Sequence, residues 1–461
     1  MAHETTTERR ELAFAGVARQ AELVRDGAVS PRELVVLALE RIGRLDPQLN
    51  AFRAVFAQRA LLEADQVGGR ARGGDDRPLL GVPIAVKDDM AVAGTPRVRG
   101  SNAHGGPEPA DAALVARLRE AGAIVIGVTR TPELTLWPFT ETAHGGPTRN
   151  PWNLARSPGG SSGGSGSAVA AALVAAATAS DGAGSIRIPA ACCGLFGLKT
   201  QRGRVSTVPL REVWTGLSVY GFLTRSVADS ALLYEIATGR PYVEAARRES
   251  GTLRIALSVK IPPGAVARLD GEQRGAAQDT AELLRSLGHE VVERDPSYGL
   301  IGRNVIVRYL AGAHAEAQTV PDRGRLERRT RGMVRLGAAA RPLLRRALAA
   351  QAADAARINA IFDDVDVVLT PTLTAGPLPI GRYEGCGALR TFNAAGGFVA
   401  FNPVWNHIGN PAAALPAGFD AAGLPLSVHL GGRPGSEQTL LSLARQLEVA
   451  RPWAGARPAI S

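Results

Sequence analysis

The sequence contains very little lysine, although it is strongly basic. Only three of its 53 basic residues are lysines (Lys87, Lys199 and Lys260), and the formal net charge is +10. Arginine keeps its proton in proteins, whereas a buried lysine can lose it. A lysine in this chain is therefore expected where the chemistry needs a neutral amine, which singles out Lys87 and Lys199.

Cysteine is also scarce, and long apolar runs are missing. The three cysteines (Cys192, Cys193 and Cys386) form no disulfide framework, so we expect a reducing, cytoplasmic location. No apolar run reaches the roughly 18 residues of a membrane span. Residues 1–10 lack the apolar core of a signal peptide. Metal-ligand spacings and a dinucleotide fingerprint are absent too, so no cofactor is expected.

Aromatic residues make up only 5% of the chain, and this bears on its positive charge. Nine arginines between residues 323 and 346 alternate with Leu, Ala and Met at helical spacing. No aromatic side chain is interleaved with them to stack on bases. The pattern favours solvated arginine faces on helices, so nucleic-acid binding is not expected.

Helical and strand-like patterns alternate along the chain. Residues 8–66 are expected to be mainly helical, and Ser30-Pro-Arg-Glu33 has the pattern of a cap for a helix that extends to Arg44. A helix followed by an apolar strand is expected at three later places: 112–121 with 123–128, 278–287 with 290–293, and 352–362 with 365–370. This alternation predicts an α/β fold with a largely parallel or mixed sheet.

Two serines lie in glycine-dense segments. Ser161 is in Ser157-Pro-Gly-Gly-Ser-Ser-Gly-Gly-Ser-Gly-Ser167, and Ser185 follows it by 24 residues in Asp181-Gly-Ala-Gly-Ser-Ile-Arg187. The apolar run 168–177 between them is expected to be a buried helix. Upstream, Lys87 ends a strand-like run. A serine nucleophile, a serine proton relay and a lysine base need no histidine, so these residues favour acyl transfer and hydrolysis of an amide.

The glycine–serine segment also allows other interpretations. Gly159-Gly-Ser-Ser-Gly163 matches the G-x-S-x-G nucleophile elbow, which needs an acid and a histidine downstream. Histidines are available, but no strand of the expected length directly precedes Ser161. A phosphate-binding loop is a weaker match, because no G-K-[S/T] follows the glycines. A flexible linker conflicts with the structured apolar run that follows at once.

The ordered set of motifs resembles the amidase signature family along essentially the whole chain. The motifs that carry this resemblance are Gly81-Val-Pro-Ile-Ala-Val-Lys87, Gly159-Gly-Ser-Ser-Gly-Gly164, Asp181-Gly-Ala-Gly-Ser-Ile-Arg187, Cys193-Gly-Leu-Phe-Gly-Leu-Lys199 and Asn410-Pro-Ala-Ala-Ala-Leu-Pro-Ala-Gly-Phe419. The resemblance implies a single α/β domain over 1–461, with a mixed, mostly parallel sheet covered by helices. Its parts would be an N-terminal helical part (8–66), a signature core (75–235) and a helical insertion near the substrate site (300–355).

The resemblance also implies roles for the three polar residues. Ser185 would be the nucleophile, Ser161 would relay its proton from a cis peptide, and Lys87 would be the base. Lys87 can accept a proton only when it is neutral, so burial must lower its pKa. We therefore expect the side chains of Asp88 and Asp89 to face away from its amine.

The backbone N–H groups of Gly182, Ala183, Gly184 and Ser185 would form the oxyanion hole. Ala183 departs from the family pattern, in which glycine is usual, and it would be strained if its φ were positive. Asp181 and Arg187 are expected to brace this loop as an ion pair. His429 and Lys199 are expected to be packed, structural residues.

Candidate walls of an apolar or aromatic substrate pocket are Trp137, Phe139 and Trp214. The substrate would be a small-molecule amide, and the enzyme a free-standing amidase; homodimers are common among such enzymes. Two alternatives stay open at this point: the amidase subunit of a glutamine-dependent amidotransferase complex, and an inactive homologue that only binds.

Overall fold

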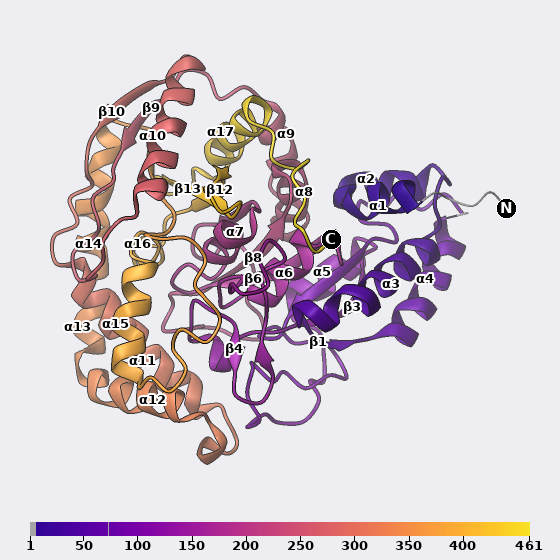
Figure 1. Cartoon of the computed structure of the whole chain (residues 1–461), viewed down its shortest axis with the longest axis horizontal. Helices are drawn as coiled ribbons and strands as arrows, with labels where there is room; N and C mark the ends of the chain where they lie inside the picture. The colour runs from indigo at the N-terminus through magenta and orange to yellow at the C-terminus, as the bar shows by residue number, and fades with distance from the viewer. Residues whose placement is uncertain (1–5, 72) are drawn as a thin grey trace.

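The fold is built on two mixed sheets, and the second of them reaches the edge of the molecule at β9 (Arg254–Leu257) and β10 (Glu290–Glu293) (Figure 1). The computed structural model describes residues 6–71 and 73–461. The first sheet has the order β1 (Phe52–Val55), β3 (Ile124–Thr129), β2 (Pro83–Lys87), β6 (Ala176–Asp181) and β8 (Val219–Thr224). The second has the order β10, β9, β11 (Val367–Pro371), β13 (Pro425–Gly432), β12 (Ala412–Phe419) and β7 (Gly197–Lys199). A bridge between Phe196 and Thr224 joins the two sheets.

The sheets are mixed, as predicted, but they are not mostly parallel. Strand β2 is parallel to β3 and β6, and β9 is parallel to β10 and β11. The other neighbours in both sheets are antiparallel. One cause is the short turn at residues 420–424 between β12 and β13, because a tight turn can join only antiparallel strands. A minor antiparallel pair, β4 (Glu141–Thr142) and β5 (Gly146–Pro147), lies outside the sheets.

Helices cover the sheets and complete one α/β domain. The helices of the N-terminal half are α1 (Thr6–Phe14), α2 (Gly16–Arg25), α3 (Pro31–Leu49), α4 (Ala57–Ala71), α5 (Ala113–Glu120), α6 (Gly163–Ala170), α7 (Arg187–Cys193), α8 (Val227–Thr238) and α9 (Tyr242–Arg247). Those of the C-terminal half are α10 (Gly271–Ser286), α11 (Ile301–Gln318), α12 (Arg328–Ala340), α13 (Leu344–Ala349), α14 (Gln351–Asn359), α15 (Ala388–Phe398), α16 (Pro403–Ile408) and α17 (Glu437–Ala450). Figure 1 shows α1 to α4 gathered at one end of the molecule and α11 to α16 at the other.

Local sequence signals set several element boundaries. Helix α3 begins after Ser30, whose hydroxyl accepts the N–H of Glu33 while the Glu33 carboxylate accepts the N–H of Ser30, so the predicted cap is confirmed. The prediction of a single buried helix over 168–177 is wrong. Helix α6 ends at Ala170, and residues from Ala176 onward form strand β6 instead. Pairing with β2 and β8 satisfies the backbone there and outweighs the helix propensity of alanine.

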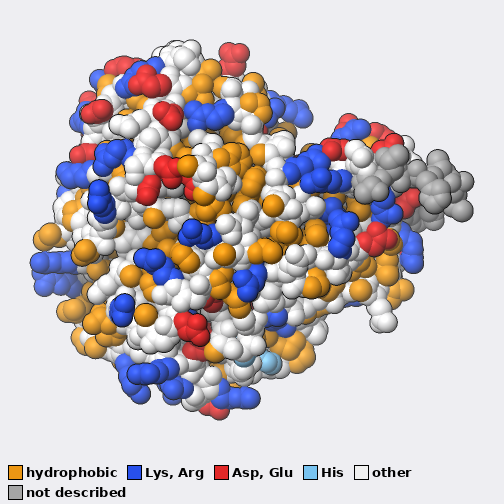
Figure 2. Space-filling view, in the orientation of Figure 1, with side chains coloured by type: hydrophobic (Ala, Val, Ile, Leu, Met, Phe, Trp, Pro, Cys, Tyr) orange, Lys and Arg blue, Asp and Glu red, His pale blue; other side chains and the backbone are white. Residues whose placement is uncertain are grey.

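The arginine-rich segment forms helices with solvated faces. In α12 the side chains of Arg328, Arg331 and Arg335 are exposed, while Thr330 and Met333 are buried. Figure 2 shows basic side chains gathered over α12 and α13. No helix in residues 6–71 and 73–461 is long and apolar enough to cross a membrane.

Candidate active site

The amine of Lys87 is buried at the carboxyl end of β2. Its Nζ lies 2.8 Å from Ser161 Oγ, 2.6 Å from Ser180 Oγ and 3.2 Å from Asp89 Oδ2. The neighbouring parallel strand β6 places Thr178 and Ser180 on one face, because side chains two residues apart share a face of a strand. Thr178 Oγ1 accepts the backbone N–H of Lys87 at 2.9 Å, and Ser180 meets its side chain. The structure thus brings Lys87 and Ser161 into direct contact.

The surroundings of Lys87 favour its neutral form. Its side chain is fully buried, and burial lowers its pKa below the ordinary value of 10.5. The carboxylates of Asp89 and Asp181 oppose this change without cancelling it. The amine can therefore accept a proton at a lower pH than an exposed lysine could.

The two aspartates after Lys87 point in different directions. Asp88 faces away from the amine and forms an ion pair with Arg53 at 3.0 Å. Burial raises the pKa of Asp88 to about 6, although Arg53 and backbone N–H groups oppose this. The prediction that Asp89 also faces away is wrong, since its carboxylate contacts Lys87 and accepts the hydroxyl of Ser180. A turn, in which the N–H of Met90 donates to the carbonyl of Lys87, brings Asp89 back over the amine.

Ser161 is held in a tightly packed glycine loop ahead of α6. The Gly160–Ser161 peptide bond is cis, and Ser161 is buried. A Cβ atom at Gly160 would lie 2.5 Å from the carbonyl oxygen of Trp137, so only glycine allows this approach. A Cβ atom at Gly159 would lie 3.1 Å from Ile188 Cγ2. The loop of Ser161 therefore packs against Trp137 on one side and against α7, which follows Ser185, on the other.

Ser185 lies in the turn between β6 and α7. Asp181 at the end of β6 accepts the N–H groups of Gly184 at 2.6 Å and Ile186 at 3.2 Å. It also forms a fully buried ion pair with Arg187 at 2.9 Å, which confirms the predicted brace. Gly184 has φ +119°, whereas Ala183 is not among the residues with positive φ. Alanine at position 183 therefore brings none of the strain that a positive φ would impose there.

The N–H groups of this turn differ in their availability. That of Gly184 is already donated to Asp181, while those of Gly182, Ala183 and Ser185 have no hydrogen-bond acceptor among the described residues. The hydroxyl of Ser185 likewise makes no hydrogen bond within the described part of the chain, and the residue is half-buried. Three backbone donors and one hydroxyl of the turn are therefore without a partner among the described residues.

Ser185 opens onto a cavity of about 420 Å³. None of the residues that line it carries a charged side chain. Its walls are residues 136–138, the β6–α7 turn, residues 262–266, one face of α11, part of α15 and the start of α16. Of the predicted pocket residues, Trp137 lines the cavity. Phe139 and Trp214 are not among its lining residues; Phe139 stacks on Trp137, and Trp214 packs on Tyr309, which does line it.

Other buried polar residues that the sequence analysis named pack around the site. His429 contacts Arg187 at 3.0 Å, and Lys199 donates to the carbonyl of Thr200 at 2.9 Å, so both are packed structural residues as expected. Cys192 and Cys193 are buried in α7. The sequence-based prediction missed Ser180, and its signal was the alternation of Thr178 and Ser180 in a strand otherwise rich in alanine.

Replacing Arg187 with methionine is expected to destabilise the fold by roughly 3–5 kcal/mol, because Asp181 would be left as an unpaired buried charge. Burial alone would raise the pKa of Asp181, but Arg187, with help from Lys199, holds it well below its ordinary value. The double variant Arg187→Met with Asp181→Asn should recover part of the loss. Thermal unfolding measures both; an unchanged melting temperature in the single variant would contradict the role of the ion pair.

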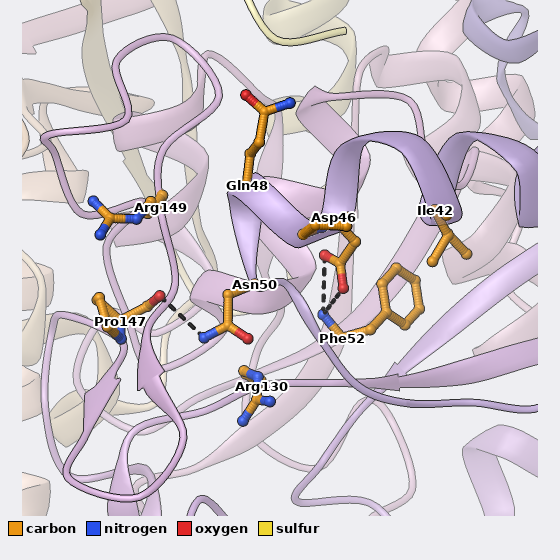
Figure 3. Close-up of a pocket in the computed structure, with 10 residues that line it drawn as sticks. Ile42, Asp46, Gln48, Asn50, Phe52, Arg130, Pro147 and Arg149 are labelled. Atoms are coloured by element: carbon orange, nitrogen blue, oxygen red, sulfur yellow. Dashed lines mark hydrogen bonds between the residues drawn. The ribbon is translucent and has the colours of Figure 1, made fainter.

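A second hollow of about 590 Å³ lies elsewhere, beside the end of α3 (Figure 3). It is lined by polar groups, among them Asp46, Asn50, Arg130 and Arg149. Asp46 accepts the backbone N–H of Phe52, and Asn50 donates to the carbonyl of Pro147, as Figure 3 shows. Asp46 and Asn50 are thus engaged with the backbone, and neither Ser161 nor Ser185 lines this hollow.

The chain is similar to members of the amidase family over nearly its full length. The family model described as Amidase matches residues 33–441. The chain is 49% identical to "Putative amidase AmiB2" of Mycobacterium tuberculosis, over 98% of this chain and 99% of that protein. It superposes on a structure of 6-aminohexanoate cyclic dimer hydrolase with substrate at a TM-score of 0.88 and 30% identity, covering 97% and 99% of the two chains.

A more distant likeness is to one subunit of the glutamyl-tRNA(Gln) amidotransferase of Thermotoga maritima. Its TM-score is 0.77 at 27% identity, covering 94% of this chain and 95% of the other. Family match, sequence identity and fold agree with one another and with the buried lysine–serine contact. The chain therefore belongs to the amidase signature family and is a hydrolase that cleaves amides.

Proposed function

We propose that Ser185, Ser161 and Lys87 carry out this hydrolysis as nucleophile, proton relay and base. The observation that supports the proposal best is the buried 2.8 Å contact between Lys87 Nζ and Ser161 Oγ. The amine also contacts Ser180 of β6, the strand that leads into the turn of Ser185, and Ser185 opens onto the cavity. Neutral Lys87 takes the proton of Ser161, and Ser161 takes that of Ser185 as Ser185 Oγ attacks the amide carbonyl. No histidine is needed for this transfer.

The later steps use the same groups in reverse. The free N–H groups of Ala183 and Ser185 stabilise the oxyanion of the tetrahedral intermediate. When the C–N bond breaks, Ser161 gives a proton to the leaving amine and takes one back from Lys87, and the acyl group stays on Ser185. Water then attacks the ester, giving its proton through Ser161, and releases the carboxylic acid and free enzyme.

The substrate we propose is a neutral amide with an apolar acyl or amine part. A cavity without charged side chains cannot pair an ionised group, and an unpaired buried charge costs several kcal/mol. From the region 300–355 only α11 contributes to the wall, with Ile301, Val305 and Tyr309 on one face. The same argument disfavours glutamine, whose ammonium and carboxylate would both lack partners.

We further propose that the enzyme acts alone. Its likeness to the cyclic dimer hydrolase, with a TM-score of 0.88, exceeds its likeness to the amidotransferase chain, for which the TM-score is 0.77. The unstrained Ala183 supports an active enzyme over an inactive homologue. The free cysteines support a cytoplasmic location. The assembly we propose is a homodimer of this chain that binds no other protein and no nucleic acid.

The test is amine or ammonia release from matched amides that differ only in one charge on the acyl part. We expect kcat/KM for the neutral amide to exceed that for its carboxylate analogue by at least about 100-fold. Val305→Arg, which places a cation on the cavity wall, should reverse part of this preference. Val307→Arg, on the same helix but off the cavity wall, is the control and should keep it. Equal rates for both amides in the natural protein would refute the proposed substrate class.

A further inference from the structure

The amine of Lys87 has more polar neighbours than proton transfer to Ser161 requires. Besides Ser161 Oγ at 2.8 Å, Ser180 Oγ lies at 2.6 Å and Asp89 Oδ2 at 3.2 Å. Ser180 in turn donates its hydroxyl hydrogen to the same Asp89 oxygen. The three groups around the amine come from the end of β2, the end of β6 and the loop before α6. They surround it from different segments of the chain.

Counting hydrogens fixes the direction of each bond. A neutral lysine amine has two hydrogens and one lone pair. A carboxylate can only accept, so Asp89 takes one amine hydrogen. Ser180 has given its own hydrogen to Asp89, so its oxygen accepts the second. Both hydrogens are then engaged, and the lone pair is left for the remaining neighbour, the hydroxyl of Ser161.

We propose that Asp89 and Ser180 are positioning residues that fix the rotation of the Lys87 amine so that its lone pair faces the Ser161 hydroxyl. The Asp89 carboxylate also stabilises the ammonium that forms when Lys87 accepts the proton. This inference rests on the proposed function, because it assigns how the base of that reaction is oriented. In this step the O–H bond of Ser161 breaks and an N–H bond forms on Lys87, while Ser161 takes the proton of Ser185 as Ser185 Oγ attacks the amide carbonyl.

The charged groups near Lys87 differ in their ion-pair partners, and this difference singles out Asp89. Asp181 also acts on Lys87, but its carboxylate is already paired with Arg187. Asp88 is paired with Arg53. Arg99 is near Asp89 yet forms its ion pair with Glu316 at 2.7 Å.

The other contacts of Asp89 are few. Tyr220 on β8 stays neutral, since burial and then Asp89 raise its pKa. The second oxygen of Asp89, Oδ1, is buried without a hydrogen bond within the described residues. The polar contacts of the Asp89 carboxylate are therefore those with Lys87 and Ser180.

The test is the pH dependence of kcat/KM in Asp89→Asn. Activity requires neutral Lys87, so it is present above the pKa of that amine and lost as the pH falls through it. Removing a carboxylate beside an ammonium disfavours the charged form, so the acid midpoint should move down by at least one pH unit. The plateau at high pH should fall at least tenfold, because the ammonium loses its partner and the amine its orientation. Asp89→Glu, which keeps the charge, should return the midpoint towards its original value.

Controls separate this inference from the proposed function and from misfolding. Asp88→Asn, which removes a charge directed at Arg53, should leave the midpoint within a few tenths of a pH unit. Folding of Asp89→Asn is checked by circular dichroism; if it is impaired, Ser180→Ala provides the second test and should lower the plateau at least fivefold. An unmoved midpoint in folded Asp89→Asn, or an unchanged plateau in Ser180→Ala, would overturn the inference. Full activity in Ser185→Ala would instead overturn the proposed function itself.

Discussion

Replacing Ser185 with alanine is expected to lower kcat/KM for amide hydrolysis by at least about 10⁴-fold. Loss of a serine nucleophile removes the acyl-enzyme route and leaves only the weaker catalysis of binding and oxyanion stabilisation. The fold should be unaffected, since the hydroxyl of Ser185 makes no hydrogen bond to any described residue. The effect should lie in kcat, with KM nearly unchanged, because the cavity walls remain.

Amine release under saturating substrate, with mass spectrometry after a serine-directed sulfonyl fluoride, measures this prediction. The natural protein should gain one adduct on Ser185, and the variant none. Ala183→Gly is the matched control in the same turn, and its activity should stay within about twofold because Ala183 has no positive φ to relieve. A variant Ser185→Ala that hydrolyses amides at the original rate would remove this serine from the mechanism.

Lys87→Met is expected to lower kcat by about 10²- to 10⁴-fold, the contribution of a positioned general base. Lys87→Arg is the sharper comparison, because it keeps the positive charge but cannot release its proton. A comparable loss in both variants would show that the neutral amine is what matters. If Lys87→Arg kept most of the activity, the charge alone would suffice and the base assignment would fail.

Stability must be followed beside the rate in these variants. Lys87→Met leaves the buried oxygen of Asp89 without the amine that contacts it, so the melting temperature should fall. The double variant Lys87→Met with Asp89→Asn also removes the carboxylate charge and should recover part of that loss while staying inactive. In the natural protein, we expect the activity to disappear as the pH falls through the lowered pKa of Lys87, because the amine then becomes protonated.

Local patterns were sufficient for much of the secondary structure. The capping pattern at Ser30 located the start of α3, and the apolar run ending at Lys87 located β2. These signals work because capping and strand alternation involve residues close in the chain. The helix prediction for residues 168–177 was wrong for the opposite reason. Its alanines favour a helix locally, but pairing with distant strands makes its second half part of the sheet.

The orientation of side chains around the amine was beyond local patterns. Asp88 and Asp89 are adjacent and chemically identical, yet one pairs with Arg53 and the other covers Lys87. Which of them does so depends on the turn after β2 and on the position of β6. The mixed rather than mostly parallel pairing of the sheets has the same origin, since it depends on contacts between distant segments.

The sequence by itself determined the residue types of the site: one lysine among arginines, and two serines in glycine-dense segments. These types follow from chemistry, because a base must be able to lose its proton and a tight turn excludes bulky side chains. Only the tertiary structure decided the charge-free cavity, the contact of Asp89 with Lys87 and the part played by Ser180. The physical reason is that burial and electrostatic environment belong to groups brought together from distant parts of the chain.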